Sequence, residues 1–338
     1  MKRGAGGAPT PGAAVSGAFF RMNKRKRFAF RHGATADWLR RGMRLPFILA
    51  SVVCSLAYAD TGGETVAKKS GTRKLGLSIQ VQGGGWGRGR KDAIETVLYS
   101  VADEMLSRLP GRLKAPIVVT HTDGPPVAEY GRGSQGEYRI RLHAQGENWH
   151  LYAYEFAHEL CHVLSNHDAH VAAHDNQWFE ETLCETASLF TLKNLAQRWE
   201  QAPPGPQWQA EAVRLRAFFD LLIAEGHRRL PPEAPLTTWL HDNEEALRSN
   251  PYLRQKNEVL ANLLLPLFER NPENWQALSY MNLDPGDARS SLRSYLGQWY
   301  GNTPLAHRDL VAGVLALLAL DDVVPPDRPA GSLTALAE

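Results

Sequence analysis

Cysteine is scarce in this chain, with three residues among 338, at positions 54, 161 and 184. So few cysteines exclude a small fold held together by a framework of disulfides. Long apolar runs are also missing: the two most apolar stretches, 45–56 and 310–320, hold 12 and 11 residues, whereas a membrane span needs roughly 20. The Gly-rich segment 83–90 lacks the Lys-Ser/Thr pair of a phosphate-binding loop, so we expect only a flexible turn there.

Acidic residues are almost absent from the first 59 positions, which contain eleven basic residues and one acid, Asp37. The remainder of the chain has 27 basic and 35 acidic residues, a net charge of −8. A domain with that charge repels phosphate, so nucleic acid is not an expected partner. At 43% hydrophobic residues the chain is not disordered as a whole.

The end of this basic segment has the three regions of a secretory signal peptide. From Met43 the chain reads MRLPFILASVVCSLAYAD, a basic start and an apolar run followed by a small-x-small pattern that predicts cleavage after Ala59. The simplest account of residues 1–42 is a start assigned too early, with Met22 or Met43 as the true one. A second account reads Arg40-Arg41 as a twin-arginine export signal. Both predict a periplasmic or secreted protein without stable membrane insertion of the mature chain.

Strand and helix patterns divide the exported part into two halves. The first half predicts strands and helices, and the second half predicts helices with few strands. The expected strands are 75–81, 116–120 and 138–142, and the expected helices are 91–109, 148–164, 178–202, 210–225, 260–270 and 307–320. We therefore expect an α+β fold with a strand-containing subdomain at 60–200, a mainly helical subdomain at 207–322 and a polar tail at 323–338.

The chemistry is concentrated in the sequence HELCH, which covers His158 to His162 within an expected helix. Two histidines four positions apart lie on one helical face, so both imidazoles can bind one zinc ion. Glu159 lies beside them, where it can reach a zinc-bound water without ligating the metal. This pattern predicts one Zn²⁺ held by His158 and His162, with Glu159 as the general base.

A catalytic zinc site needs a third protein ligand, and the residues alone leave the choice open. Glu180 and Glu181 both follow HELCH on the next expected helix, and 18 residues separate HELCH from Glu181. Asp168, six positions after His162, is an alternative of the metzincin kind, although Ser165 stands where those sites use Gly.

One spacing pattern resembles that of the gluzincins, the zinc peptidases related to thermolysin and to certain aminopeptidases. It consists of HELCH, a spacer of 18 residues, Glu181 and then Glu185 four residues later. The flanking WFEETL is similar to the Trp-x-x-Glu-Gly stretch of the aminopeptidase branch, with Thr182 in place of Gly. The match covers residues 156–185. The resemblance implies a zincin-like fold, in which a small strand-containing upper subdomain carries the active-site helix above a mainly helical lower one. It also implies that Glu181 is the third ligand and that Glu185 hydrogen-bonds a zinc-bound histidine.

The same resemblance suggests a donor for the developing oxyanion. Pro251-Tyr252 before a long apolar helix is similar to the segment that carries the transition-state tyrosine of aminopeptidase-like members, although Leu253-Arg254-Gln255 replaces the usual Glu-Lys-Gly. Tyr252 is therefore the expected donor. The sequence offers four other candidates for this donor: His241, Tyr280, Tyr295 and His307.

Cys161 and Cys184 each lie three residues after an expected ligand, His158 and Glu181. If the two helices pack across the zinc, the cysteines could approach closely enough for a disulfide. The alternative is a pair of small buried hydrophobic residues.

These patterns favour an exported zinc peptidase that hydrolyses peptides or proteins, with strand 138–142 expected as a sheet edge that aligns the substrate. Two alternatives are a zincin-fold binding module of the cell envelope without turnover, and a hydrolase of cell-wall peptides.

Overall fold

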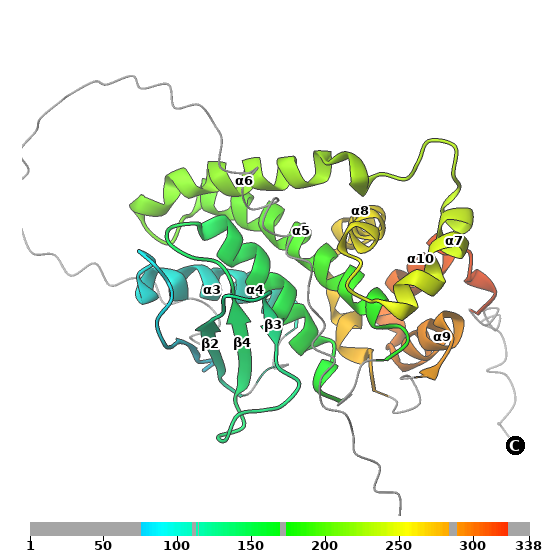
Figure 1. The fold of residues 1–338 in the computed structure, drawn as a ribbon, viewed down its shortest axis with the longest axis horizontal. Helices are drawn as coiled ribbons and strands as arrows, with labels where there is room; N and C mark the ends of the chain where they lie inside the picture. The colour runs from blue at the N-terminus through cyan, green and yellow to red at the C-terminus, as the bar shows by residue number, and fades with distance from the viewer. Residues whose placement is uncertain (1–75, 110–112, 114, 170–173, 284–288, 324–338) are drawn as a thin grey trace, which may run out of the picture. The chain divides into compact units, whose positions relative to one another are not determined.

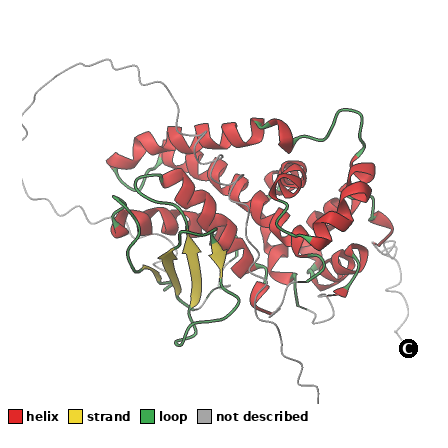
Figure 2. Cartoon of the chain, viewed as in Figure 1, coloured by secondary structure: helices red, strands yellow, loops and turns green. Residues whose placement is uncertain are grey.

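The computed structural model describes residues 76–109, 113, 115–169, 174–283 and 289–323, all within one compact unit, Glu64–Glu338 (Figure 1). The expected leader at 1–59 and nearly all of the polar tail at 323–338 lie outside these residues. The fold is α+β, with helices as the main component and one small sheet (Figure 2). The expected class is thereby confirmed.

The sheet has four strands in the order β1-β2-β4-β3. β1 (Ile79–Val81), β2 (Ile117–His121) and β4 (Tyr138–Leu142) run parallel, and β3 (Val127–Ala128) pairs antiparallel with β4. Along β4, Ile140 and Leu142 are buried while Arg139 and Arg141 are exposed, as the alternation predicts. The buried face packs against α3 (Lys91–Leu106) and α4 (Trp149–Leu164).

The expectation that 138–142 forms an edge of the sheet is wrong. β4 lies between two partners, with Val119 of β2 opposite Ile140 on one side and Ala128 of β3 opposite Ile140 on the other. The edge beside β4 is β3, whose two residues are too few to give an alternating pattern in the sequence. β3, not β4, therefore ends the sheet on this side.

Helix α4 carries HELCH and is buried around most of its circumference. It contacts α3, β3, β4, α5 (Gln177–Gln201) and α6 (Gln209–Ala224), so few of its positions face water. Glu155 fastens the helix to the end of β4, because one carboxylate oxygen accepts hydrogen bonds from the backbone N–H groups of His143 and Ala144, both at 2.9 Å. These bonds fix the position of α4, and with it His158 and His162, along the direction of β4.

Helix α5 joins the two expected subdomains, because it packs on α4 and also on α6 and α8 (Arg254–Arg270). α7 (Leu236–Ser249) and α9 (Leu292–Asn302) were not expected from the sequence, and α8 begins six residues before the predicted start. α7 buries only Leu240 and Leu247. The remaining elements are η1 (His167–Ala169), η2 (Pro206–Trp208), η3 (Gly226–Arg228), η4 (Pro272–Tyr280), η6 (Leu305–His307), α10 (Arg308–Leu317) and η7 (Asp321–Val323).

The Gly-rich segment 83–90 forms a turn, as expected, and its residues are mostly exposed apart from Trp86. Trp86 at its centre is buried, and its carbonyl accepts hydrogen bonds from the N–H groups of Gly89 and Gly146, each at 2.9 Å. A Cβ on Gly89 would lie 2.7 Å from the carbonyl oxygen of Gly146, so only glycine fits there. The turn thus braces the segment that leads into α4.

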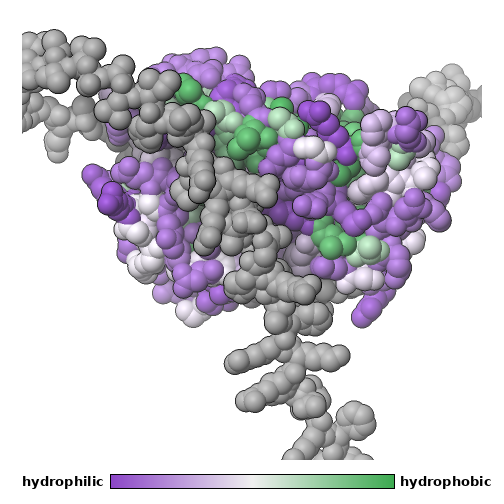
Figure 3. Space-filling model, turned by 45° about the horizontal axis from the view of Figure 1, so that its top comes forward, coloured by the Kyte–Doolittle hydropathy of each residue, from purple (hydrophilic) through white to green (hydrophobic). Residues whose placement is uncertain are grey.

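The face of the molecule drawn in Figure 3 is mostly hydrophilic, with small hydrophobic areas between polar ones. Among the helices that the structure describes, none is long and apolar enough to cross a bilayer.

Candidate metal centre

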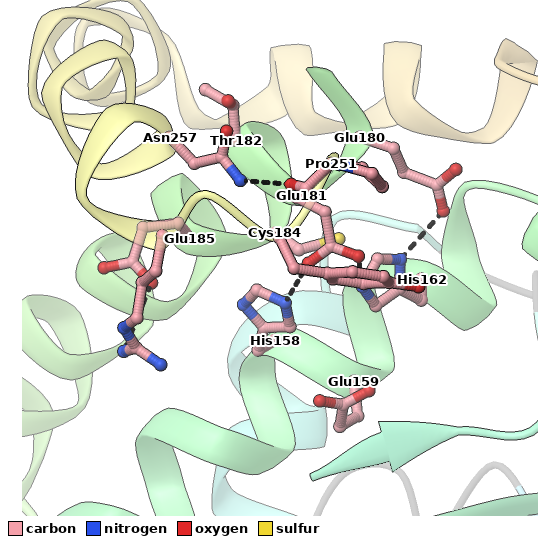
Figure 4. A network of polar contacts seen from close by, with 12 residues as sticks. His158, Glu159, His162, Glu180, Glu181, Thr182, Cys184, Glu185, Pro251 and Asn257 are labelled. Carbon is pink, nitrogen blue, oxygen red and sulfur yellow. Dashed lines mark hydrogen bonds and ion pairs between the residues drawn. The ribbon is translucent and has the colours of Figure 1, made fainter. Parts of the chain in front are cut away.

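His158 and His162 of α4 face Glu181 of α5, as Figure 4 shows. Nε2 of His158 lies 3.2 Å from one oxygen of the Glu181 carboxylate, and Nε2 of His162 lies 3.5 Å from the other. One ligand atom from each of the three residues falls within 4.8 Å of the others. The structure therefore brings together the ligand set expected from the sequence.

This trio fits a divalent cation that accepts nitrogen and oxygen ligands. Two imidazole nitrogens and a carboxylate are a ligand set that zinc enzymes use, and both Nε2 atoms point to the same carboxylate. Burial alone would lower the pKa of His162, but Glu181 and Glu180 raise it well above its usual value. Burial would likewise raise the pKa of Glu181, yet the charge of His162 and hydrogen bonds from both histidines lower it to about 2. The site thus favours positive charge between ionised carboxylates.

Glu180 has a role that the sequence did not reveal. Its carboxylate is buried and lies 2.8 Å from Nδ1 of His162, on the side of the ring opposite to Glu181 (Figure 4). The same carboxylate accepts hydrogen bonds from Ser165 at 2.8 Å and Asn282 at 3.1 Å, and contacts Nε2 of His174 at 3.3 Å. Glu180 therefore orients His162 rather than competing with Glu181 as a ligand.

The metzincin-like alternative is not supported by the geometry. Asp168 pairs with Arg132, whose Nε lies 2.8 Å from the Asp168 carboxylate, and it does not join the group of converging ligand atoms.

Glu159 lies beside the ligand set without belonging to it (Figure 4). One oxygen of its carboxylate accepts a 2.6 Å hydrogen bond from the backbone N–H of Ala128 in β3. Burial raises the pKa of Glu159, while the neighbouring charges of His158 and His162 oppose the rise. The backbone bond fixes the carboxylate and leaves its second oxygen for another donor.

Glu185 has other partners than the zinc-bound histidine that the resemblance implied. Its carboxylate accepts hydrogen bonds from the Tyr154 hydroxyl and from Nη1 of Arg228, the latter at 2.8 Å. Figure 4 shows the carboxylate directed away from Glu181. Of Glu180 and Glu185, it is Glu180 that contacts a ligand histidine.

Arg228 is the centre of a buried ion-pair network that the sequence gave no reason to expect. Its guanidinium contacts Glu185 at 2.8 Å, Glu258 at 2.9 Å and Glu225 at 3.1 Å, with the side chain fully buried. Arg254 joins from α8, with Nε 2.7 Å from the same Glu258. The network ties α5, η3 and α8 together one helical turn from the ligands.

Tyr252 contacts Gln177, which lies four residues before Glu181 on α5, and among the described residues its hydroxyl makes no contact with the trio itself. Its side chain is largely exposed, its hydroxyl accepts a 2.9 Å hydrogen bond from Gln177, and Glu181 is among the charges that raise its pKa after burial itself. Tyr295 is instead buried and donates to Asn282 at 2.8 Å. The structure gives none of the three other candidates a contact with the ligands: His241, Tyr280 and His307.

Cys161 and Cys184 are both fully buried and are free thiols in the structure. A hydrogen bond joins them across α4 and α5, and burial together with this contact raises the pKa of the Cys184 thiol. The two cysteines are therefore close, as a disulfide would require, and in the structure they are the pair of small buried residues that the sequence left as the alternative.

Comparison with known proteins adds no relative, since no family model, curated protein or solved structure matches the chain.

Proposed function

We propose that this chain is a zinc-dependent peptidase of the gluzincin type, with a zincin-like fold. The observation that carries the proposal is the convergence of His158, His162 and Glu181 within 4.8 Å, with Glu159 next to them and outside the ligand set. A purely structural zinc site has no need of a free carboxylate beside the metal.

The chain's own residues supply the remaining parts of a hydrolytic mechanism. Zinc, when bound by the trio, polarises the scissile carbonyl and lowers the pKa of water toward about 7. Glu159 takes the proton of the attacking water on the oxygen that Ala128 leaves open, and passes it to the leaving amine. The Tyr252 hydroxyl donates to the carbonyl oxygen as it gains negative charge.

We also propose that the protein acts outside the cytoplasm. The support is the signal-peptide pattern that ends at Ala59. Amino-terminal sequencing of exported protein should start at or near Asp60. A first residue upstream of Met43 would contradict the predicted cleavage.

Metal analysis combined with a substrate screen tests the proposed function. Purified mature protein should contain one zinc per chain, lose it in Glu181→Gln, and cleave members of a library of mixed peptides and wall-peptide fragments. Cleavage confined to the wall fragments would identify a cell-wall hydrolase with the same chemistry. One zinc per chain with no cleavage would instead identify a binding module.

A further inference from the structure

Two tyrosines from different parts of the chain converge on one amide. Tyr130 follows β3, Tyr252 precedes α8, and Gln177 is the first residue of α5. The Gln177 side-chain nitrogen donates to the Tyr130 hydroxyl at 3.1 Å and to the Tyr252 hydroxyl at 2.9 Å. Gln177 is 4% exposed, whereas Tyr130 and Tyr252 are 38% and 56% exposed, so a buried amide holds two phenols that reach the surface.

This group belongs to the rim of the metal centre. Gln177 lies four residues before Glu181, on the same face of α5. The Tyr130 ring packs on His167 at 5.3 Å between ring centroids, and the His167 ring is 6.1 Å from that of His162. Asn257 holds the other tyrosine's segment in place by donating to the Pro251 carbonyl at 2.7 Å.

Both phenols are set up as hydrogen-bond donors. Each hydroxyl oxygen already accepts the Gln177 N–H, and among the residues that the structure describes neither hydroxyl has an acceptor for its own proton. Burial and the nearby charges raise the pKa of Tyr130 to about 12. The hydroxyl therefore keeps its proton over the whole range in which a peptidase works.

We propose that Tyr130 is a second substrate-contacting donor, which binds the oxyanion of the scissile group together with Tyr252, and that Gln177 is the residue that positions both. The proposal rests on the proposed peptidase function. It adds a residue from the strand-containing half to a role that the resemblance assigned to the helical half alone, so a bound substrate would be held from both sides.

Removing each hydroxyl tests the donors. Tyr130→Phe should keep its zinc and lose on the order of 10²-fold in kcat, the lower end of what one oxyanion donor contributes, because Tyr252 remains. Tyr252→Phe should lose at least as much, and the double variant more than either single one. Tyr300→Phe, which removes a hydroxyl from α9, is the matched control and should leave kcat unchanged.

Two substitutions at Gln177 test the positioning role. In Gln177→Glu the carboxylate accepts both phenol protons, so kcat should fall as far as in the double Phe variant. Gln177→Met keeps the length of the side chain and leaves the protons free, so its loss should be smaller. In the double Phe background Gln177→Glu should cause no additional loss, an outcome that a merely structural Gln177 does not produce.

Failure of this inference is distinguishable from failure of the proposed function. If wild type is active, Glu159→Gln is inactive and Tyr130→Phe retains full kcat, Tyr130 is not a donor and the peptidase proposal stands. If zinc-loaded wild type cleaves no peptide, both are overturned.

Discussion

Replacing Glu180 by Gln should weaken zinc binding without abolishing it. The carboxylate is 3% exposed, and its first oxygen contacts His162 and Ser165 while its second contacts His174 and Asn282. The Gln side chain has the same size but carries an NH₂ group in place of one oxygen. In either orientation of the amide, this NH₂ faces two groups that donate hydrogen bonds to the Glu180 carboxylate, so those two bonds are lost. Loss of such an outer-shell partner typically costs about 10- to 100-fold in metal affinity, which is about 1.4–2.8 kcal/mol.

The assay is competition for zinc with a chromophoric chelator at neutral pH, with Glu181→Gln as the matched neighbour. Glu181→Gln removes a ligand and should cost more affinity than Glu180→Gln does. Wild-type affinity in Glu180→Gln would refute the orienting role. Loss of zinc in Glu180→Gln together with retention in Glu181→Gln would show that the assignment of the third ligand is off by one residue.

Two further predictions concern the surroundings of the site. Arg228→Met leaves Glu185 and Glu258 short of a buried partner and should lower the free energy of unfolding by about 3 kcal/mol at neutral pH. Although burial opposes ionisation, Arg228 and Arg254 hold the pKa of Glu185 below its ordinary 4.5. The stability that the Glu185 ion pair contributes is therefore complete above pH 4.5 and is lost as the carboxylate is protonated at lower pH. In denaturant titrations the difference in unfolding free energy between wild type and Arg228→Met should shrink below pH 4.5. A difference that does not change with pH would contradict the ion pair. Because Cys161 and Cys184 are buried free thiols, unfolded protein should give two labelled thiols with or without prior reduction, and labelling that appears only after reduction would contradict this and show a disulfide.

The ligand set was predictable because it depends on local geometry. The spacing of His158 and His162 places them on one helical face whatever surrounds the helix. The choice of Glu181 came from the resemblance, and the structure shows why it differs from Glu180: the two carboxylates approach His162 from opposite sides of the ring.

The surroundings of the ligands were not predictable because their partners are distant in sequence. Asn282 reaches Glu180 from 102 residues away, and Arg228 reaches Glu185 across 43 residues. Neither residue belongs to a motif, and a buried arginine looks like a surface residue in a sequence. β3 was not predicted because two residues are too few to show an alternating pattern. The hydrogen bond from Ala128 of β3 to Glu159 could therefore not be predicted either.

Glu159→Gln separates a zinc peptidase that uses this carboxylate as its base from a chain that only binds zinc. Glu159 is not one of the three residues whose ligand atoms converge, so the variant should keep the fold and one zinc per chain. A general base contributes about 10²–10⁴-fold, and one that also returns the proton to the amine should lie near the upper end. The kcat for a cleaved library peptide should therefore fall by about 10³–10⁴-fold at equal zinc content. Full activity in zinc-loaded Glu159→Gln would contradict the role of Glu159 as the base.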